Sequence, residues 1–209
     1  MYIPDRYKNK NIDAVKDFLS DNAFGILIHQ GNQKLQGTHI PMLLDQDKNG
    51  NNILVGHLSR ANPQWQHFKD NDEILAIFTG AHCYISSSWY QKESVPTWNY
   101  IAVHVYGKIK IVEGKTLIDD MRMLVDKYEK TSKDPVSMDR LSPKSMKMVH
   151  GVVGFQIEIT EIQAAYKLSQ NRDETDHKNI IKELEQLGDC HSKAIADEMK
   201  KNDQNGSTA

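Results

Sequence analysis

The stretch from Ala102 to Ile111 alternates apolar and polar side chains almost without a break. Because successive side chains of a β-strand point to opposite faces of a sheet, this alternation predicts a strand with one buried face. Short turns separate further candidate strands along the chain. The expected strands cover residues 23–29, 34–44, 52–58, 73–79, 82–86 and 100–112. Consecutive strands joined by short turns favour an antiparallel barrel over a layered α/β fold.

Helical periodicity occurs before and after these strands. Residues 11–19 place Ile12, Val15 and Phe18 on one face, as expected of a short amphipathic helix. One more strand is expected at residues 152–162, and a polar tail at 202–209. The remaining helices are expected at 115–129, 138–149 (broken near Pro143), 178–187 and 192–201. The sequence therefore predicts a mainly β protein with helical decoration, in the α+β class.

Composition narrows the function classes. Lys and Arg total 26 against 28 Asp and Glu, which gives a formal net charge of −2 and no general attraction to nucleic acid. Cys83 and Cys190 are too few for a disulfide scaffold or a thiolate metal site. The first six residues carry no secretion signal, and no apolar run approaches the roughly 20 residues of a membrane-spanning helix. We therefore expect a cytoplasmic protein with no membrane association.

The segment from Gly56 to Trp65 combines anion-binding side chains directly after a predicted strand. Ser59, Arg60 and Asn62 offer a hydroxyl, a guanidinium and an amide, which together suit a phosphate group. The alternative interpretation makes Arg60 a surface ion-pair partner and Pro63 the first residue of a helix. Both interpretations stay open on the sequence alone.

Aromatic rings and hydroxyl groups gather between Ser86 and Tyr100. Trp89, Tyr90 and Trp98 could stack on a flat heteroaromatic ring while Thr97 or Asn99 binds its polar edge. An aromatic satellite core or a dimer contact explains the same residues equally well. A third segment, residues 166–172, offers a dense set of donors after the last strand.

Other chemistry finds little support in the sequence. The nine histidines lie singly on separate segments, so we expect no metal site. Nucleophile-elbow and nucleotide-binding glycine motifs are absent, so no catalytic residue is assigned. The last two helices resemble a helix-turn-helix only in their spacing, because mixed charge on the second one argues against base reading.

Six motifs occur in an order that resembles the PaiB-like family, described as FMN-binding negative transcriptional regulators. The motifs are MYIP at 1–4, THIP at 38–41, GHLSRANPQW at 56–65, AHCYIS at 81–86, VPTWNY at 95–100 and KLSQNR at 167–172. This resemblance implies a flavin-reductase-like antiparallel split β-barrel with C-terminal helices, related in fold to pyridoxamine-phosphate oxidases. It also implies a homodimer with the flavin near the subunit interface, and repression of protease or sporulation-type genes. A partnership with DNA rests on the resemblance only.

The same resemblance suggests an FMN-binding domain over residues 1–175, with a helical extension and tail over 176–209 packed on it. It implies that the phosphate end of FMN contacts His57, Ser59, Arg60 and Asn62. It implies that the ribityl chain and ring approach Thr79, Gly80, Thr97, Trp98, Asn99 and Tyr100. It implies that Lys167, Gln170 and Arg172 close the site.

Two further functions remain as alternatives on this scaffold. A flavin-dependent oxidoreductase or haem-degrading enzyme would need no general base from the protein, because the cofactor carries the difficult step. A dimeric binding module without flavin is the other alternative.

Overall fold

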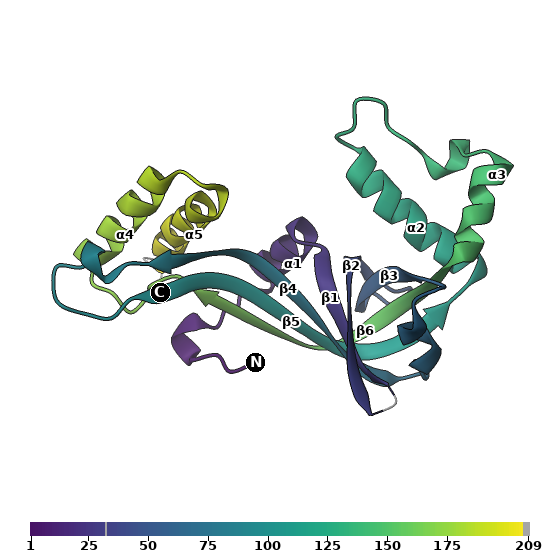
Figure 1. Ribbon diagram of the computed structural model, residues 1–209, viewed down its shortest axis with the longest axis horizontal. Coiled ribbons are helices and arrows are strands. Elements are labelled where there is room, and N and C mark those ends of the chain that lie inside the picture. The colour runs from purple at the N-terminus through teal and green to yellow at the C-terminus, as the bar shows by residue number, and fades with distance from the viewer. Residues whose placement is uncertain (32, 207–209) are drawn as a thin grey trace. The chain divides into compact units, whose positions relative to one another are not determined.

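The computed structural model of the chain describes residues 1–31 and 33–206, with side chains described through residue 202 (Figure 1). The strands are β1 (Phe24–Gly31), β2 (Lys34–Gln46), β3 (Asn52–Ser59), β4 (Asp72–Ile85), β5 (Thr97–Val112) and β6 (Val152–Lys167). The α-helices are α1 (Ile12–Asp21), α2 (Gly114–Glu129), α3 (Pro143–Met146), α4 (Glu174–Leu187) and α5 (Cys190–Gly206). Five 3₁₀ turns complete the order: η1 (Asp5–Tyr7), η2 (Pro63–His67), η3 (Ser87–Trp89), η4 (Met138–Arg140) and η5 (Lys147–Gly151).

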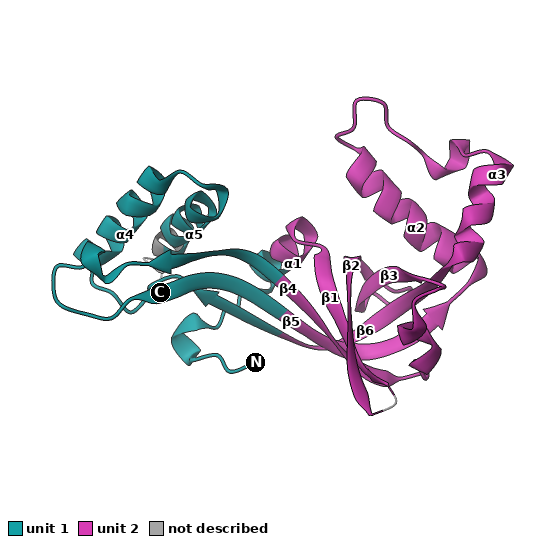
Figure 2. Cartoon of the chain, in the orientation of Figure 1, with its two compact units in different colours: residues 1–15, 79–103, 163–209 teal, residues 16–78, 104–162 magenta. Residues whose placement is uncertain are grey.

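The chain forms two compact units, coloured separately in Figure 2. Unit 1 contains residues 1–15, 79–103 and 163–209, and unit 2 contains residues 16–78 and 104–162. Three strands, β4, β5 and β6, run through residues of both units, so each long strand contributes to both. The expected division of the chain near residue 175 stays a prediction.

Unit 2 contains a closed barrel with the strand order β1-β2-β3-β6-β5-β4. The pairs β1–β2, β1–β4, β2–β3 and β3–β6 are antiparallel. Alternate residues of each strand line the barrel interior, as the period-2 pattern of the sequence predicts. In β1, for example, Gly25, Leu27 and His29 are buried and point inward. The residues between them, Phe24, Ile26 and Ile28, are more exposed and point outward. The antiparallel barrel and the α+β class predicted from the sequence are therefore confirmed.

Two glycines allow large rings to fill this barrel. A Cβ atom added at Gly56 would lie 2.7 Å from the ring of Phe155, its register partner on β6. A Cβ atom at Gly25 would lie 2.9 Å from the ring of Phe78. Both phenylalanines are fully buried. The missing side chains on β1 and β3 thus make room for the two largest of the fully buried side chains that the structure describes.

Unit 1 joins the outer parts of β4, β5 and β6 to the helices α4 and α5. The helices meet through apolar residues that are fully buried: Ile180, Leu184, Ile195, Ala196 and Met199. Gly188 ends α4 with a positive φ of 73°, the left-handed conformation that terminates many helices. Asp189 then accepts the backbone N–H groups of His191 and Ser192 at 3.0 Å, which starts α5 directly.

Three expectations on secondary structure are wrong in detail. Residues 73–79 and 82–86 belong to one strand, β4, because Gly80 continues the extended chain instead of turning it. The helix expected at 138–149 is three short pieces, η4, α3 and η5. The tail expected from residue 202 is helical through Gly206, and its end, 207–209, lies outside the described residues. None of the described helices is long and apolar enough to cross a membrane.

Candidate functional site

The loop after β3, in unit 2, is held together by the side chain that we expected to bind phosphate. The Nε of Arg60 donates to the His150 carbonyl at 2.9 Å, and its Nη2 donates to the Val152 carbonyl at 3.1 Å. The guanidinium lies 5.6 Å from the centroid of the Trp65 ring. The indole Nε1 of Trp65 in turn donates to the Arg60 carbonyl at 2.9 Å. Arg60 thus ties its loop to the start of β6 with two of its five N–H donors, and the donors left for a ligand are those of Nη1 and the second N–H of Nη2.

The rest of this loop supports the helix start that was the alternative interpretation. Asn62 accepts the backbone N–H of Gln64 at 2.9 Å and caps η2, whose first residue is Pro63. The Nδ2 of Asn62 also donates to Thr38 Oγ1 at 2.9 Å. Ser59 accepts the N–H of Ala61 at 3.3 Å. His57 is half-buried on β3, and burial lowers the pKa of its imidazole, which favours the neutral ring.

In unit 1, the start of β5 meets the chain that follows β6. Asn99 is completely buried and accepts the Ser169 hydroxyl at 3.1 Å, while its Nδ2 donates to the sulfur of Met199 at 3.6 Å. Ser169 has a φ of 62°, a left-handed conformation that is uncommon outside glycine. Asn99 therefore holds the turn after β6 to α5 and is not exposed to a ligand.

Lys167 and Arg172 form a pair of cations in the same region. Lys167 donates to the hydroxyl of Thr97, and its pKa is lowered first by burial and then by the charge of Arg172. Arg172 donates to Ser94 Oγ at 3.0 Å, and its guanidinium carbon lies 3.9 Å from the centre of the Tyr90 ring. Among the described residues, no carboxylate lies within ion-pair distance of either cation. Two neighbouring positive charges without an acidic partner are suited to an anion.

An exposed aromatic cluster lies on the same unit. Trp98 is 53% exposed, and its ring centroid lies 6.0 Å from that of Tyr84 and 6.3 Å from that of His82. The ring of His191, from α5, lies 4.5 Å from that of His82 at an angle of 63°. A flat heteroaromatic ligand could stack on such a cluster.

The remaining predicted residues of unit 1 lie beside these groups in the fold. Thr79 and Gly80 are consecutive residues of β4, and the Gly80 carbonyl lies 3.2 Å from His82 Nδ1. Tyr100 is half-buried on β5. Gln170 folds its own turn, since it accepts the N–H of Leu168 at 2.8 Å and donates to the Tyr166 carbonyl at 2.5 Å.

The predicted site residues are thus divided between the units. His57, Ser59, Arg60 and Asn62 belong to unit 2, and the other nine to unit 1. Sequence reasoning missed Ser94 and His191, which contact Arg172 and His82 from distant positions in the chain. Ser94 lies in the hydroxyl-rich segment between Ser86 and Tyr100 but in none of the six motifs, and His191 lies in neither, so no local pattern singles them out.

Comparison with known proteins places the chain in a family. Residues 1–161 match the family model described as "Putative FMN-binding domain". The chain is 42% identical over 201 residues to "Protease synthase and sporulation protein PAI 2" of Bacillus subtilis, covering 96% of this chain and 97% of that protein. It is also 27% identical over 244 residues to an uncharacterised protein of Emericella nidulans, covering 94% of this chain and 95% of that protein.

Solved structures share the fold at low identity. The flavocytochrome Anf3 of Azotobacter vinelandii superposes with a TM-score of 0.62 at 14% identity, covering 82% of this chain and 75% of that one. The FAD and heme binding protein of Mycobacterium smegmatis gives a TM-score of 0.58 at 12% identity, covering 82% and 78%. These structures support the split-barrel fold. With the family model and the near full-length relative, they show that this chain belongs to the PaiB-like family of FMN-binding-domain proteins.

Proposed function

We propose that the protein binds FMN and acts as a regulatory protein of the PaiB type. The observation that carries the proposal is the cation pair of Lys167 and Arg172, which lacks an acidic partner among the described residues, in a chain that matches an FMN-binding family model. A flavin phosphate carries the negative charge that such a pair requires.

The residues of unit 1 fit the chemical parts of FMN. Lys167, Arg172 and the Thr97 hydroxyl offer a donor set for the phosphate. The exposed rings of Trp98 and Tyr84 offer a surface for the isoalloxazine. When bound, FMN would supply hydride or single-electron transfer, and the protein would supply binding and orientation. The family resemblance instead assigns the phosphate to the loop that contains Arg60. The two assignments predict that different substitutions weaken FMN binding: those of Lys167 and Arg172 in one case, and that of Arg60 in the other.

An FMN titration of the purified, desalted protein tests the proposal and separates the two assignments. We expect saturable binding, which the quenching of flavin fluorescence measures. Lys167→Met and Arg172→Met should each weaken FMN binding about tenfold or more while leaving riboflavin binding little changed, because riboflavin has no phosphate. Lys193→Met, at an exposed position of α5, is the matched control.

Each result of that titration has a definite meaning. A large loss in Arg60→Ala with no loss in the Lys167 variant would move the phosphate to the loop after β3. No saturable FMN binding by the folded wild-type protein would contradict the flavin proposal as a whole.

We infer a homodimer from one face of the barrel. Register pairing puts Phe24, Ile26 and Ile28 of β1 opposite Pro41, His39 and Gly37 of β2. Ile77 and Leu75 of β4 pair with Ile26 and Ile28 on the other side. The inward positions between them are buried, so these residues form an outward face that is apolar apart from His39. Contiguous apolar faces of this kind mark interaction surfaces in soluble proteins.

The regulatory role is supported by the printed name of the 42%-identical relative, which refers to protease synthesis and sporulation. We expect that deletion of the gene raises transcription of extracellular protease genes, and that the wild-type gene restores repression. The Lys167→Met variant should restore repression poorly if FMN occupancy controls the output. Unchanged protease transcripts in the deletion strain would contradict the regulatory role and leave the FMN titration unaffected.

A further inference from the structure

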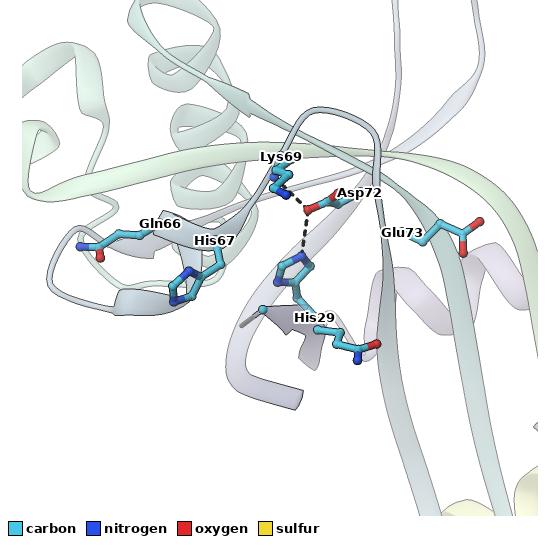
Figure 3. A pocket seen from close by; sticks show the side chains of 8 residues that line it. His29, Gln66, His67, Lys69, Asp72 and Glu73 are labelled. Atoms are coloured by element: carbon cyan, nitrogen blue, oxygen red, sulfur yellow. Dashed lines mark hydrogen bonds and ion pairs between the residues drawn. The ribbon is translucent and has the colours of Figure 1, made fainter. Parts of the chain in front are cut away.

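A polar cavity at one end of the unit 2 barrel is lined by a buried histidine, His29, whose second ring nitrogen has no partner among the residues that the structure describes. The cavity has a volume of about 410 Å³. Its walls include His29 and Gln30 of β1, Gln66 and His67 of η2, and Asp72 and Glu73 of β4 (Figure 3). None of these wall residues lies in a motif that carries the family resemblance, since the nearest motif ends at Trp65 within η2, and the flavin proposal does not use them.

Two contacts fix the imidazole ring of His29. Its Nε2 lies 3.1 Å from Asp72 Oδ2, as the dashed line in Figure 3 shows. The ring meets the ring of Phe68 edge to face, with centroids 5.0 Å apart and planes at 87°. His29 is only 3% exposed, so neither contact is exchanged for water.

The carboxylate of Asp72 determines which nitrogen carries the proton. The backbone N–H of Lys69 also donates to Asp72 Oδ2 at 3.0 Å. This hydrogen bond, together with the one from His29 Nε2, lowers the pKa of Asp72, so the carboxylate stays ionised at neutral pH. An ionised carboxylate accepts only, so Nε2 of His29 is the nitrogen that donates to it, and in the neutral form of this ring the lone pair lies on Nδ1.

That Nδ1 is buried and has no hydrogen-bond partner among the described residues. A buried acceptor without a donor costs stability, and native proteins rarely leave one unsatisfied unless a ligand or water completes it. A ligand with an N–H or O–H group directed at Nδ1 would donate the missing hydrogen bond.

The cavity is also built to keep its shape. Gln64, which is 1% exposed, donates to the carbonyls of Leu27 and Gln36 at 3.1 and 3.3 Å and so attaches η2 to β1 and β2. Gly31 lets η2 approach β1, because a Cβ there would lie 2.7 Å from the Cβ of His67. A rigid wall lowers the conformational entropy that the protein itself would lose when a ligand binds.

We infer that this cavity binds a small polyhydroxylated ligand, a sugar or polyol, through a hydroxyl group that donates to His29 Nδ1. The walls combine acceptors, on His29, Asp72 and Glu73, with donors on Lys69 and the glutamine amides. Hydroxyl groups satisfy both kinds at once, because each donates one hydrogen bond and accepts others. An anion would meet the two carboxylates, and an apolar molecule would leave the polar walls unsatisfied.

The test follows the His29 ring by long-range ¹H–¹⁵N spectra of protein labelled at histidine, during titration with D-ribose and with glycerol. We expect an Nε2–H tautomer in the free protein and a saturable shift of the Nδ1 signal with ribose. Asp72→Asn should weaken the ribose affinity about tenfold, because it removes the charge that fixes the tautomer. Asp134→Asn, at an exposed position between α2 and η4, is the matched control and should bind as wild type does.

Several results would overturn the inference. One is an Nδ1 signal that none of the polyols moves. Another is a response to ethanolamine or inorganic phosphate in place of ribose. A third is a ribose response that saturating FMN abolishes, because the cavity would then belong to the flavin site. A persisting ribose response in a protein that fails to bind FMN would support the inference and count only against the flavin proposal.

Discussion

Asp120, on α2, is a residue at which burial and hydrogen bonding act in opposite directions. It is 8% exposed and accepts the Nε2 of Gln156 at 3.1 Å. Burial raises the pKa of its carboxyl group, and the charges of Asp45 and Asp119 raise it further, while the bond from Gln156 lowers it only in part. The ionised carboxylate is therefore less favourable in the folded protein than in the unfolded chain.

We expect Asp120→Asn to raise the free energy of unfolding at pH 7, since the amide can still accept from Gln156 without a charge. The folded pKa lies above the unfolded value of 3.8, so wild-type stability falls as pH rises through this interval. The advantage of the variant should vanish below pH 3.8 and be complete above the folded pKa. Urea unfolding between pH 3 and pH 7 measures this difference in the free energy of unfolding.

Asp119→Asn is the control, and its free energy of unfolding should fall by up to about 1 kcal/mol, because Asp119 pairs with Arg122 on the surface. A less stable Asp120→Asn protein at pH 7 would refute this account.

The two cysteines differ in reactivity for a physical reason. Cys83 is buried on β4, and burial raises the pKa of its thiol to about 12, whereas Cys190 is exposed at the start of α5. Only the thiolate reacts with a disulfide reagent. We expect one thiol of the native protein to react at pH 8, the second to react after unfolding, and Cys190→Ser to abolish the native reaction. Rapid reaction of both thiols in the native state would contradict the burial of Cys83.

Two elements of the barrel approach each other closely where β5 passes β6 at Gly107. A Cβ atom added at Gly107 of β5 would lie 2.4 Å from the carbonyl oxygen of Glu158 and 2.6 Å from Ile157 Cγ2. The nearest atom belongs to the backbone, so β6 itself would have to move. Gly107 therefore sets the spacing of two neighbouring strands.

We expect Gly107→Ala to destabilise the protein by about 2 kcal/mol or more, since overpacking forces backbone shifts. Thermal unfolding monitored by circular dichroism measures the loss. Gly151→Ala is the matched control, because a Cβ at Gly151 meets no atom within 4 Å. Its effect should stay within about 0.5 kcal/mol. Equal stabilities for the two variants would show that the barrel adapts more easily than the contacts indicate.

Local pattern predicted most of these elements, but not their ends or their partners. Alternation identified the strands of the barrel, because one buried face is a property of each strand alone. It divided β4 at Gly80, where glycine is equally compatible with a turn and with extended chain. It could not pair Lys167 with Thr97 or Arg172 with Tyr90, which are far apart in sequence and meet only through the fold. Nor could it single out His29 among the nine histidines, since its partner Asp72 lies 43 positions away.

At the scale of the whole molecule, the outward apolar face of β4, β1 and β2 exposes large apolar side chains to water, and a partner that covered it would remove them from water. Phe24 is 63% exposed and Leu35 is 69% exposed, and the register of β1 and β2 puts both on this face. The near-neutral net charge of −2 gives little repulsion between two copies. Burial of this face in a second copy would remove the exposed apolar area from water.

We expect the wild-type protein to have the mass of two chains in size-exclusion chromatography with light scattering, and Phe24→Lys/Leu35→Lys to have the mass of one. Both residues are exposed, so the double substitution should leave the barrel folded, as circular dichroism would show. Tyr128→Lys is the matched control, because Tyr128 is 50% exposed on α2, outside the apolar face, and its substitution should leave the mass unchanged. Charges in an apolar interface would be desolvated without partners, which is why two lysines per chain should suffice to separate the copies. A wild-type monomer, or a dimer unaffected by the double substitution, would exclude this face as the interface.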